Sequence, residues 1–166
     1  MRIHPAGIET WQDFFLAQIG ASAALLGLLF VGVSLNLARI LSVPLPPGRA
    51  MLALLLLLGV LVAGFLVLIP GLPPMLLGAG MLLIGATLSW AAVGVSFALR
   101  RGALAAGPVI ALNLLLTALS TLPYLVAAGL LFRGDMAALY WIATGMIVSV
   151  IKSVADAWVL LVEINR

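Results

Sequence analysis

Residues 50–69 read AMLALLLLLGVLVAGFLVLI, a run of twenty positions without one charged, amide or hydroxyl side chain. A helix needs about 20 apolar residues to cross the hydrocarbon core of a bilayer. This run has that length, and Pro70 follows it directly. Because proline does not continue a helix interior, the sequence predicts one transmembrane helix that ends here.

Four further apolar runs flank this one and fill most of the chain. Lipid offers the backbone no hydrogen-bond partners, so each run is expected to form a helix, which satisfies its own backbone groups. A transmembrane barrel would instead alternate apolar and polar residues over segments of about 10 residues. We therefore expect an all-α polytopic membrane protein, a bundle of five transmembrane helices in one domain over residues 1–166. The expected spans are residues 14–38, 50–70, 75–99, 107–132 and 137–162.

The composition excludes an ordinary soluble protein. Of the 166 residues, 65% are hydrophobic and 8% are charged, whereas soluble domains have about 45–50% apolar and about 25% charged residues. Eight basic and five acidic residues give the net charge of +3, and most of the basic residues flank the apolar runs. A nucleic-acid surface would be a clustered basic patch on a folded domain. We expect contact with the lipid bilayer and none with nucleic acid.

The basic residues also predict the orientation, because cytoplasmic loops carry an excess of lysine and arginine. An N-out, C-in arrangement places five basic residues in the cytoplasm and two outside. The first group is Arg39, Arg49, Arg100, Arg101 and Arg166, and the second is Arg2 and Arg133. Seven arginines beside one lysine suit a GC-rich genome. We expect a multi-pass protein of the bacterial inner (cytoplasmic) membrane.

The fifth run carries the side chains that are most costly to bury in lipid. Gly145, Ser149, Lys152 and Asp156 share one helical face, since four, three and four residues separate them. A charge at mid-membrane costs about 2.5–3.5 kcal/mol on insertion scales, so such residues face the bundle interior or a wet cavity. Two interpretations of Lys152 and Asp156 stay open: an ion pair that holds helices together, or a functional site, either part of an ion or proton path or a counter-charge for a ligand.

Polar residues line one side of the fourth run as well. They are Asn113, Thr117, Ser120, Thr121 and Tyr124. Pro123 is expected to kink the helix beside them. Hydrogen bonds between transmembrane helices contribute only about 0.6 kcal/mol each on average. Polar contacts between helices are the favoured interpretation of this face, and a pore lining is the alternative.

Small residues recur along the first run at steps of four and three. Gly20, Ala24 and Gly27 form one face on which another helix can pack closely. The neighbouring face includes Gly32 and has polar ends around an apolar middle. That pattern is typical of a helix lining a narrow pore with a hydrophobic constriction, and also of the commoner central helix of a bundle. We predict close helix packing at Gly20, Ala24, Gly27 and Gly32.

Depth in the membrane connects three of the runs. With the N-terminus outside, the polar residues of the first, fourth and fifth runs all lie toward the cytoplasmic side. We predict that they meet in one cluster or line one vestibule open to the cytoplasm. The predicted cluster is Lys152, Asp156, Ser149, Asn113, Thr117, Asn36 and Ser34.

The sequence carries no recognisable catalytic or metal-binding pattern. His4, the single histidine, lies outside the expected spans, and cysteine is absent. A dyad of Ser149 and Lys152 would need a neutral lysine, whereas Asp156 favours the charged form. We therefore expect no enzyme activity, no metal site and no cofactor.

Two resemblances add to this interpretation. Trp11-x-Asp13-Phe14-Phe15, GASAALLGLLFV at residues 20–31 and AWVLLVE at residues 157–163 resemble a family of small bacterial membrane proteins. Some members of that family are labelled modulators of the FtsH protease. The resemblance covers about a quarter of the chain and implies a place beside a membrane protease.

The second resemblance covers one helix. SAALLGLLFVGV at residues 22–33 is similar to the pore-lining first helix of Orai calcium channels, which assemble as hexamers. The glutamate of that family's selectivity ring falls near Leu35 or Asn36, where this chain has no acid. The resemblance therefore implies a homo-oligomer without implying calcium selectivity.

These observations predict a non-enzymatic integral membrane protein. The leading interpretation is a channel-like homo-oligomeric pore, or small-solute or ion conduit. The alternative is an accessory or regulatory subunit of a larger membrane complex, such as a membrane protease.

Overall fold

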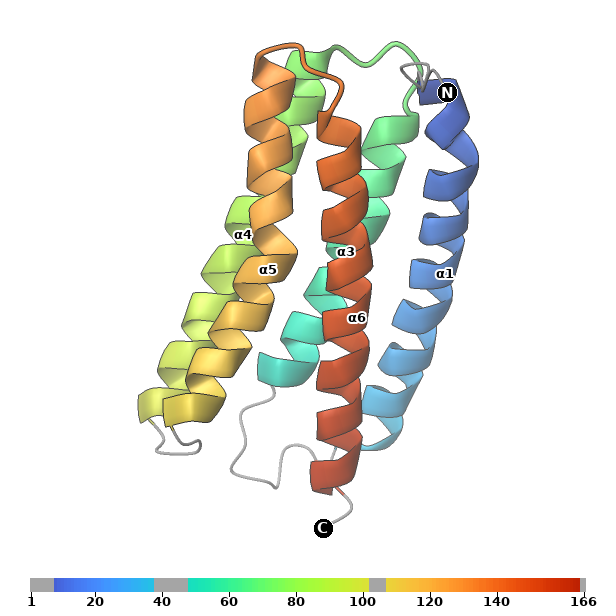
Figure 1. Ribbon diagram of the computed structural model, residues 1–166. Coiled ribbons are helices and arrows are strands. Elements are labelled where there is room, and N and C mark those ends of the chain that lie inside the picture. Colours follow the sequence, from blue (N-terminus) through green and yellow to red (C-terminus); the bar gives the residue numbers. More distant parts are fainter. Residues whose placement is uncertain (1–7, 38–47, 102–106, 165–166) are drawn as a thin grey trace, which may run out of the picture.

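The computed structural model describes residues 8–37, 48–101 and 107–164, and these form five helices (Figure 1). Each described helix is long and apolar enough to cross a membrane, which makes the chain an integral membrane protein. Arg2, His4, Arg39 and Arg166 lie outside the described residues. The helices are α1 (Ile8–Leu35), α3 (Gly48–Leu68), α4 (Pro74–Arg101), α5 (Gly107–Phe132) and α6 (Ala138–Ile164).

Proline and glycine mark the described ends of these helices. α4 begins at Pro74, and α5 begins with Gly107 and Pro108. Proline suits the first turn of a helix, where its missing N–H has no partner to lose. Gly71 and Gly134 lie in the turns before α4 and α6 with φ of 71° and 74°, a left-handed conformation that glycine adopts without strain. The spans predicted from the sequence agree with the helices to within a few residues, except that α1 starts at Ile8.

Neighbouring helices run in opposite directions through the bundle (Figure 1). α4 and α5 form one closely packed pair, α3 and α6 lie centrally, and α1 packs mainly on α3 at the opposite edge. The turns before α4 and α6 lie at the end of the bundle where α1 begins. α3 and α5 begin at the other end, where α4 and α6 finish. The fold therefore brings Arg49, Arg100 and Arg101 to one end and Arg133 to the other.

The closest helix contacts occur at glycines of the central helices. A Cβ atom at Gly85 of α4 would lie 2.7 Å from Leu125 of α5, and one at Gly64 of α3 would lie 2.6 Å from Ile19 of α1. Such positions leave no room for a side chain. Small residues let transmembrane helices approach each other, so these glycines set how closely the bundle packs.

The glycines of α1 do not serve this purpose within the chain. A Cβ atom at Gly20, Gly27 or Gly32 would meet no atom within 4 Å, and Ala24 is exposed. The prediction of close packing at these four residues is therefore wrong for contacts inside the described chain. The physical reason is the position of α1 at the edge of the bundle, where it turns Phe15 and Ser22 inward and its small residues outward.

An aromatic cluster fixes the beginning of α1 to the beginning of α6. The ring centroids of Trp11 and Tyr140 lie 4.7 Å apart in an edge-to-face arrangement. The ring centroids of Phe14 and Phe15 lie 5.3 Å apart, also edge to face. Edge-to-face pairs of this kind contribute about 0.5–1.5 kcal/mol beyond their buried area. The cluster holds α1 at one end of the bundle while most of its length remains exposed.

Candidate functional site

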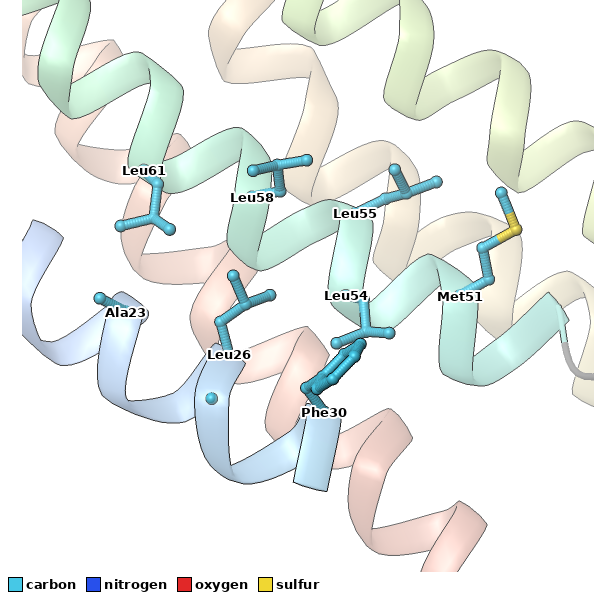
Figure 2. A pocket seen from close by; sticks show the side chains of 9 residues that line it. Ala23, Leu26, Phe30, Met51, Leu54, Leu55, Leu58 and Leu61 are labelled. Carbon is cyan, nitrogen blue, oxygen red and sulfur yellow. The ribbon is translucent and has the colours of Figure 1, made fainter. Parts of the chain in front are cut away.

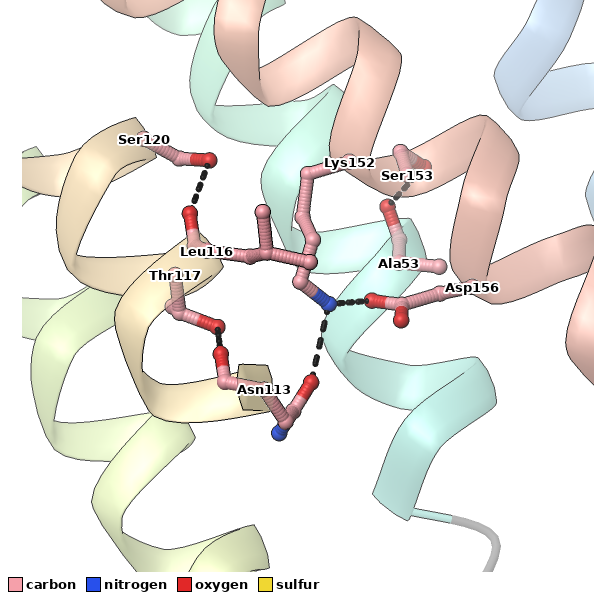
Figure 3. A network of polar contacts seen from close by, with 8 residues as sticks. All are labelled: Ala53, Asn113, Leu116, Thr117, Ser120, Lys152, Ser153 and Asp156. Carbon is pink, nitrogen blue, oxygen red and sulfur yellow. Dashed lines mark hydrogen bonds and ion pairs between the residues drawn. The ribbon is translucent and has the colours of Figure 1, made fainter. Parts of the chain in front are cut away.

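The site centres on Lys152, a charged residue buried within a membrane-spanning helix. Its side chain on α6 is 4% exposed, and Asp156, one turn further along the same helix, is 7% exposed. The ammonium group of Lys152 forms an ion pair with the Asp156 carboxylate. It also donates a hydrogen bond to Oδ1 of Asn113 on α5 at 3.0 Å (Figure 3). The structure thus brings three of the predicted cluster residues into direct contact.

The rotation of α6 explains why this charge faces inward. Ile151, just before Lys152, and Val154, between Lys152 and Asp156, are 63% and 47% exposed, so they lie on the opposite face of the helix. Ser153 donates its hydroxyl to the backbone carbonyl of Ala53 on α3 at 2.8 Å. This bond ties α6 to α3 beside the ion pair, and Lys152 consequently lies at the junction of α3, α5 and α6.

The hydrogen-bonding chemistry of Lys152 determines how Asn113 is oriented. An ammonium group donates only, so Asn113 must present its carbonyl oxygen to it. The amide nitrogen of Asn113 then points away from Lys152 (Figure 3). This nitrogen is buried, and among the described residues it has no hydrogen-bond partner. A buried amide donor without a partner is costly, and it marks a place where a further acceptor would be stabilising.

Polar residues continue from the ion pair toward the middle of the membrane, along the contact between α5 and α6. Thr117 and Ser120 donate to carbonyls of their own helix at 2.8 and 3.0 Å. The hydroxyls of Ser149 and Tyr124 are buried and lie near enough to interact with each other, although neither makes a well-formed hydrogen bond to a described residue. We call the set from Asp156 to Tyr124 the polar row. Its members are Asp156, Lys152, Asn113, Ser149, Thr117, Ser120 and Tyr124.

Beyond Tyr124 the contact between α5 and α6 is apolar. Gly145 lies against the ring of Tyr124, since a Cβ atom there would be 3.1 Å from two ring carbons. α5 runs unbroken through Pro123. The buried side chains that follow are Ala127, Ala128, Leu131, Leu139 and Ile142. The polar row therefore occupies one half of the bundle, and Tyr124 lies at the boundary with the closed apolar half.

The remaining predicted residues are not brought to this site. Asn36 donates its side-chain amide to the carbonyl of Gly32 in its own helix at 2.9 Å, and Ser34 is exposed. Both residues lie on α1, which packs mainly on α3. The predicted cluster therefore forms from α5 and α6 without its α1 members.

Sequence reasoning missed two residues that belong to the site. Ser153 links α6 to α3. Its spacing of four residues from Ser149 places both serines on nearly the same face of α6, so the sequence pattern could have identified it. Arg49, in the first turn of α3, lies close enough for its positive charge to act on Lys152. Arginines at the ends of spans are ordinary topology signals, so nothing in the sequence distinguishes Arg49 from Arg100 or Arg101.

Two apolar grooves open on the outer side of α3, away from the polar row. Figure 2 shows the first, of about 440 Å³, between α1 and α3. The second, of about 240 Å³, lies between α3 and α4 and shares Leu55 and Leu58 with the first. No charged residue lines either groove. These grooves can accommodate lipid chains or apolar helices. A charged or polar ligand would instead find partners in the polar row.

Comparison with known proteins gives no further assignment. No protein-family model matches this chain, and no curated protein or solved structure matches it. The two family resemblances therefore stay predictions from the sequence.

Removing one member of the ion pair is expected to destabilise the protein more than removing both. Asp156→Leu leaves the ammonium of Lys152 buried without its counter-charge, and breaking a buried pair costs about 3–5 kcal/mol. The double variant Lys152→Met/Asp156→Leu removes both charges and should recover most of that loss. Thermal unfolding in mild detergent measures the difference, with Thr144→Ala as a control because Thr144 is exposed on the same helix. A double variant as unstable as Asp156→Leu would contradict the prediction.

Proposed function

We propose that this protein is a channel-like conduit for small ions, built from several copies of the chain in a bacterial inner membrane. The observation that carries the proposal is the ion pair of Lys152 and Asp156, buried inside a membrane-spanning bundle. Intramembrane charges are costly, and they commonly mark ion or proton paths. The proposal assigns the protein no enzymatic reaction.

The polar row gives this conduit its entrance. The amide nitrogen of Asn113 lacks a partner among the described residues, and the buried hydroxyls of Ser149 and Tyr124 interact only weakly with each other, so these groups can bind a passing ion or water. Beside these groups, the charges of Lys152 and Asp156 neutralise each other while no ion occupies the path. The apolar half beyond Tyr124 acts as the gate, because an ion leaving the row must displace tightly packed side chains there.

The distribution of charge supports an orientation for the conduit. Three described arginines, Arg49, Arg100 and Arg101, lie at the end of the bundle nearest Lys152, and Arg133 lies at the other. Basic residues concentrate on the cytoplasmic side. In the proposed N-out, C-in arrangement, the polar row opens toward the cytoplasm.

The exposed face of α1 supports assembly from several copies. Ala24, Gly20 and Gly27 lie on this face, where the chain itself places nothing against the glycines. Small residues at this spacing allow two transmembrane helices to approach closely. In the proposed assembly α1 meets a neighbouring subunit, and each subunit keeps its own polar row. Docking onto a larger membrane complex, such as a protease, is the alternative use of the same face.

Ion flux through reconstituted protein tests the conduit. We expect proteoliposomes with wild-type protein to dissipate a potassium chloride gradient. The ion flux through the double variant Lys152→Met/Asp156→Leu should be at least tenfold slower. This variant removes both charges together, so it should still fold, and Thr144→Ala should conduct like the wild type. Absence of flux from well-folded wild-type protein would reject the proposal, as would unchanged flux in the double variant.

The oligomeric state tests the role of α1. Gly27→Leu should abolish assembly without unfolding the subunit, because a Cβ atom at Gly27 has no neighbour within 4 Å and the groove beside it has room for the rest of the side chain. Gly85→Leu is the matched contrast: its side chain would collide with Leu125, and it should destabilise the subunit itself. Size-exclusion chromatography with light scattering in mild detergent distinguishes the two results. A wild-type monomer that co-purifies with another membrane complex would contradict the homo-oligomer and favour the accessory role.

A further inference from the structure

We propose that a second copy of this chain inserts Trp90 of its α4 into the apolar groove between α1 and α3. The inference deepens the proposed function: it rests on the proposed assembly from several copies and names the two surfaces that meet. Trp90 is 83% exposed, more than any other large hydrophobic side chain among the described residues. The groove shown in Figure 2 has a volume of about 440 Å³ and an apolar lining, which suits an indole ring.

The depth of Trp90 in the membrane makes lipid a poor neighbour for it. Tryptophan is enriched at the headgroup level, where its N–H finds a hydrogen-bond acceptor. Trp90 instead lies eight residues before the end of the span Pro74–Ala98, about 12 Å along the helix and thus inside the hydrocarbon core. Lipid tails offer no acceptor to its N–H. A neighbouring protein molecule can provide one, and buried tryptophans are common anchors of protein interfaces.

Gly27 gives the groove what an indole needs. A Cβ atom at Gly27 would have no neighbour within 4 Å, so the wall of the groove is open at this point. Glycine also leaves the backbone carbonyls beside it uncovered, and a carbonyl oxygen has a second lone pair that can accept the indole N–H. Phe30 and Met51 line the same groove, and aromatic and thioether side chains both pack favourably on aromatic rings.

Trp90 and Gly27 lie at the same depth. α1 and α4 run in the same direction from the same end of the bundle (Figure 1). Their spans, Trp11–Leu35 and Pro74–Ala98, have 25 residues each. Gly27 and Trp90 are both the seventeenth residue of their span. A second copy with the same orientation in the membrane therefore presents Trp90 at the level of the groove.

The match repeats seven residues to either side of this level. Residues seven apart lie on nearly the same side of an α-helix. On α4 these positions hold Leu83 and Phe97, which are 66% and 58% exposed. On α1 they hold Gly20 and Ser34, which are small and exposed. Large side chains of one copy thus meet small residues of the next at three levels, which lets the two helices pack closely.

The contact joins unlike surfaces, so it links copies head to tail. Within one chain α3 lies between α1 and α4 (Figure 1), and the exposure of Trp90 shows that it does not fill its own groove. A head-to-tail contact leaves one unfilled groove until a ring closes. Because Trp90 and Gly27 lie at the same depth, successive copies stay level in the membrane, as a closed ring requires.

Photo-crosslinking in lipid bilayers tests the contact. Replacing Trp90 with the photoreactive residue p-benzoyl-phenylalanine keeps a large aromatic side chain at this position. On irradiation it should join two copies, and mass spectrometry should find the adducts on groove residues such as Met51 and Phe30. The same replacement at Leu119 is the control, because Leu119 lies on α5 and is 55% exposed; it should give lipid adducts. Adducts of the Trp90 variant with lipid alone, or with α4 of a second copy, would overturn the proposal.

Substitutions show whether the contact holds the assembly together. Trp90→Ala should raise the dissociation constant of the assembly in bilayers at least tenfold, and Trp90→Phe, which keeps a ring but loses the N–H, should have a smaller effect. Both variants should keep the thermal stability of the subunit, since Trp90 is exposed. Leu119→Ala should assemble like the wild type. An unchanged dissociation constant in Trp90→Ala would contradict the assignment.

Flux separates this inference from the proposed function. Groove adducts of the Trp90 variant together with no ion flux from the wild type would reject the conduit and keep the contact. Ion flux from an assembled protein without groove adducts would keep the conduit and overturn the contact. A wild-type chain that stays monomeric in bilayers overturns the contact whatever its flux.

Discussion

One ammonium group that cannot face lipid organises the inner side of this bundle. The opposite face of α6 carries exposed apolar residues such as Ile151. The helix is therefore rotated so that these residues face outward and the charge of Lys152 faces the other helices. Asp156 supplies the counter-charge and Asn113 the second acceptor. Ser153 then fixes α6 to α3. The ammonium group thus joins α6 to α5, and the neighbouring Ser153 joins α6 to α3.

The rest of the bundle is held by close packing. In lipid there is little hydrophobic force to join apolar helices, so contact depends on van der Waals packing between small residues and their neighbours. Gly59, Gly85 and Gly145 provide such contacts inside the chain. They make α3, α4, α5 and α6 the compact part of the molecule and leave α1 at the edge. The compact helices hold the polar row, and in the proposed assembly α1 is the helix that meets a neighbouring subunit.

The sequence predicts the spans and the inner charge well because both depend on local properties. Run length gives the helices, and spacing puts Lys152 and Asp156 on one face. Comparison of depth along the spans even links Asn113 to them. The neighbours of α1 are different, because its periodic pattern suits a central helix and an edge helix equally. Which of its faces turns inward depends on the whole packing order, so Asn36 was predicted at a site that α1 does not reach.

The most direct test of the account uses the fact that Lys152 is the only lysine in the chain. Protein labelled with ¹⁵N at the lysine Nζ and with ¹³C at asparagine and aspartate side chains gives one nitrogen signal by solid-state NMR in lipid bilayers. The account predicts dipolar coupling of that nitrogen to one carboxyl carbon and one amide carbon, as the 3.0 Å bond to Asn113 and the ion pair with Asp156 require. A nitrogen coupled to neither, or in contact with lipid acyl chains, would contradict it.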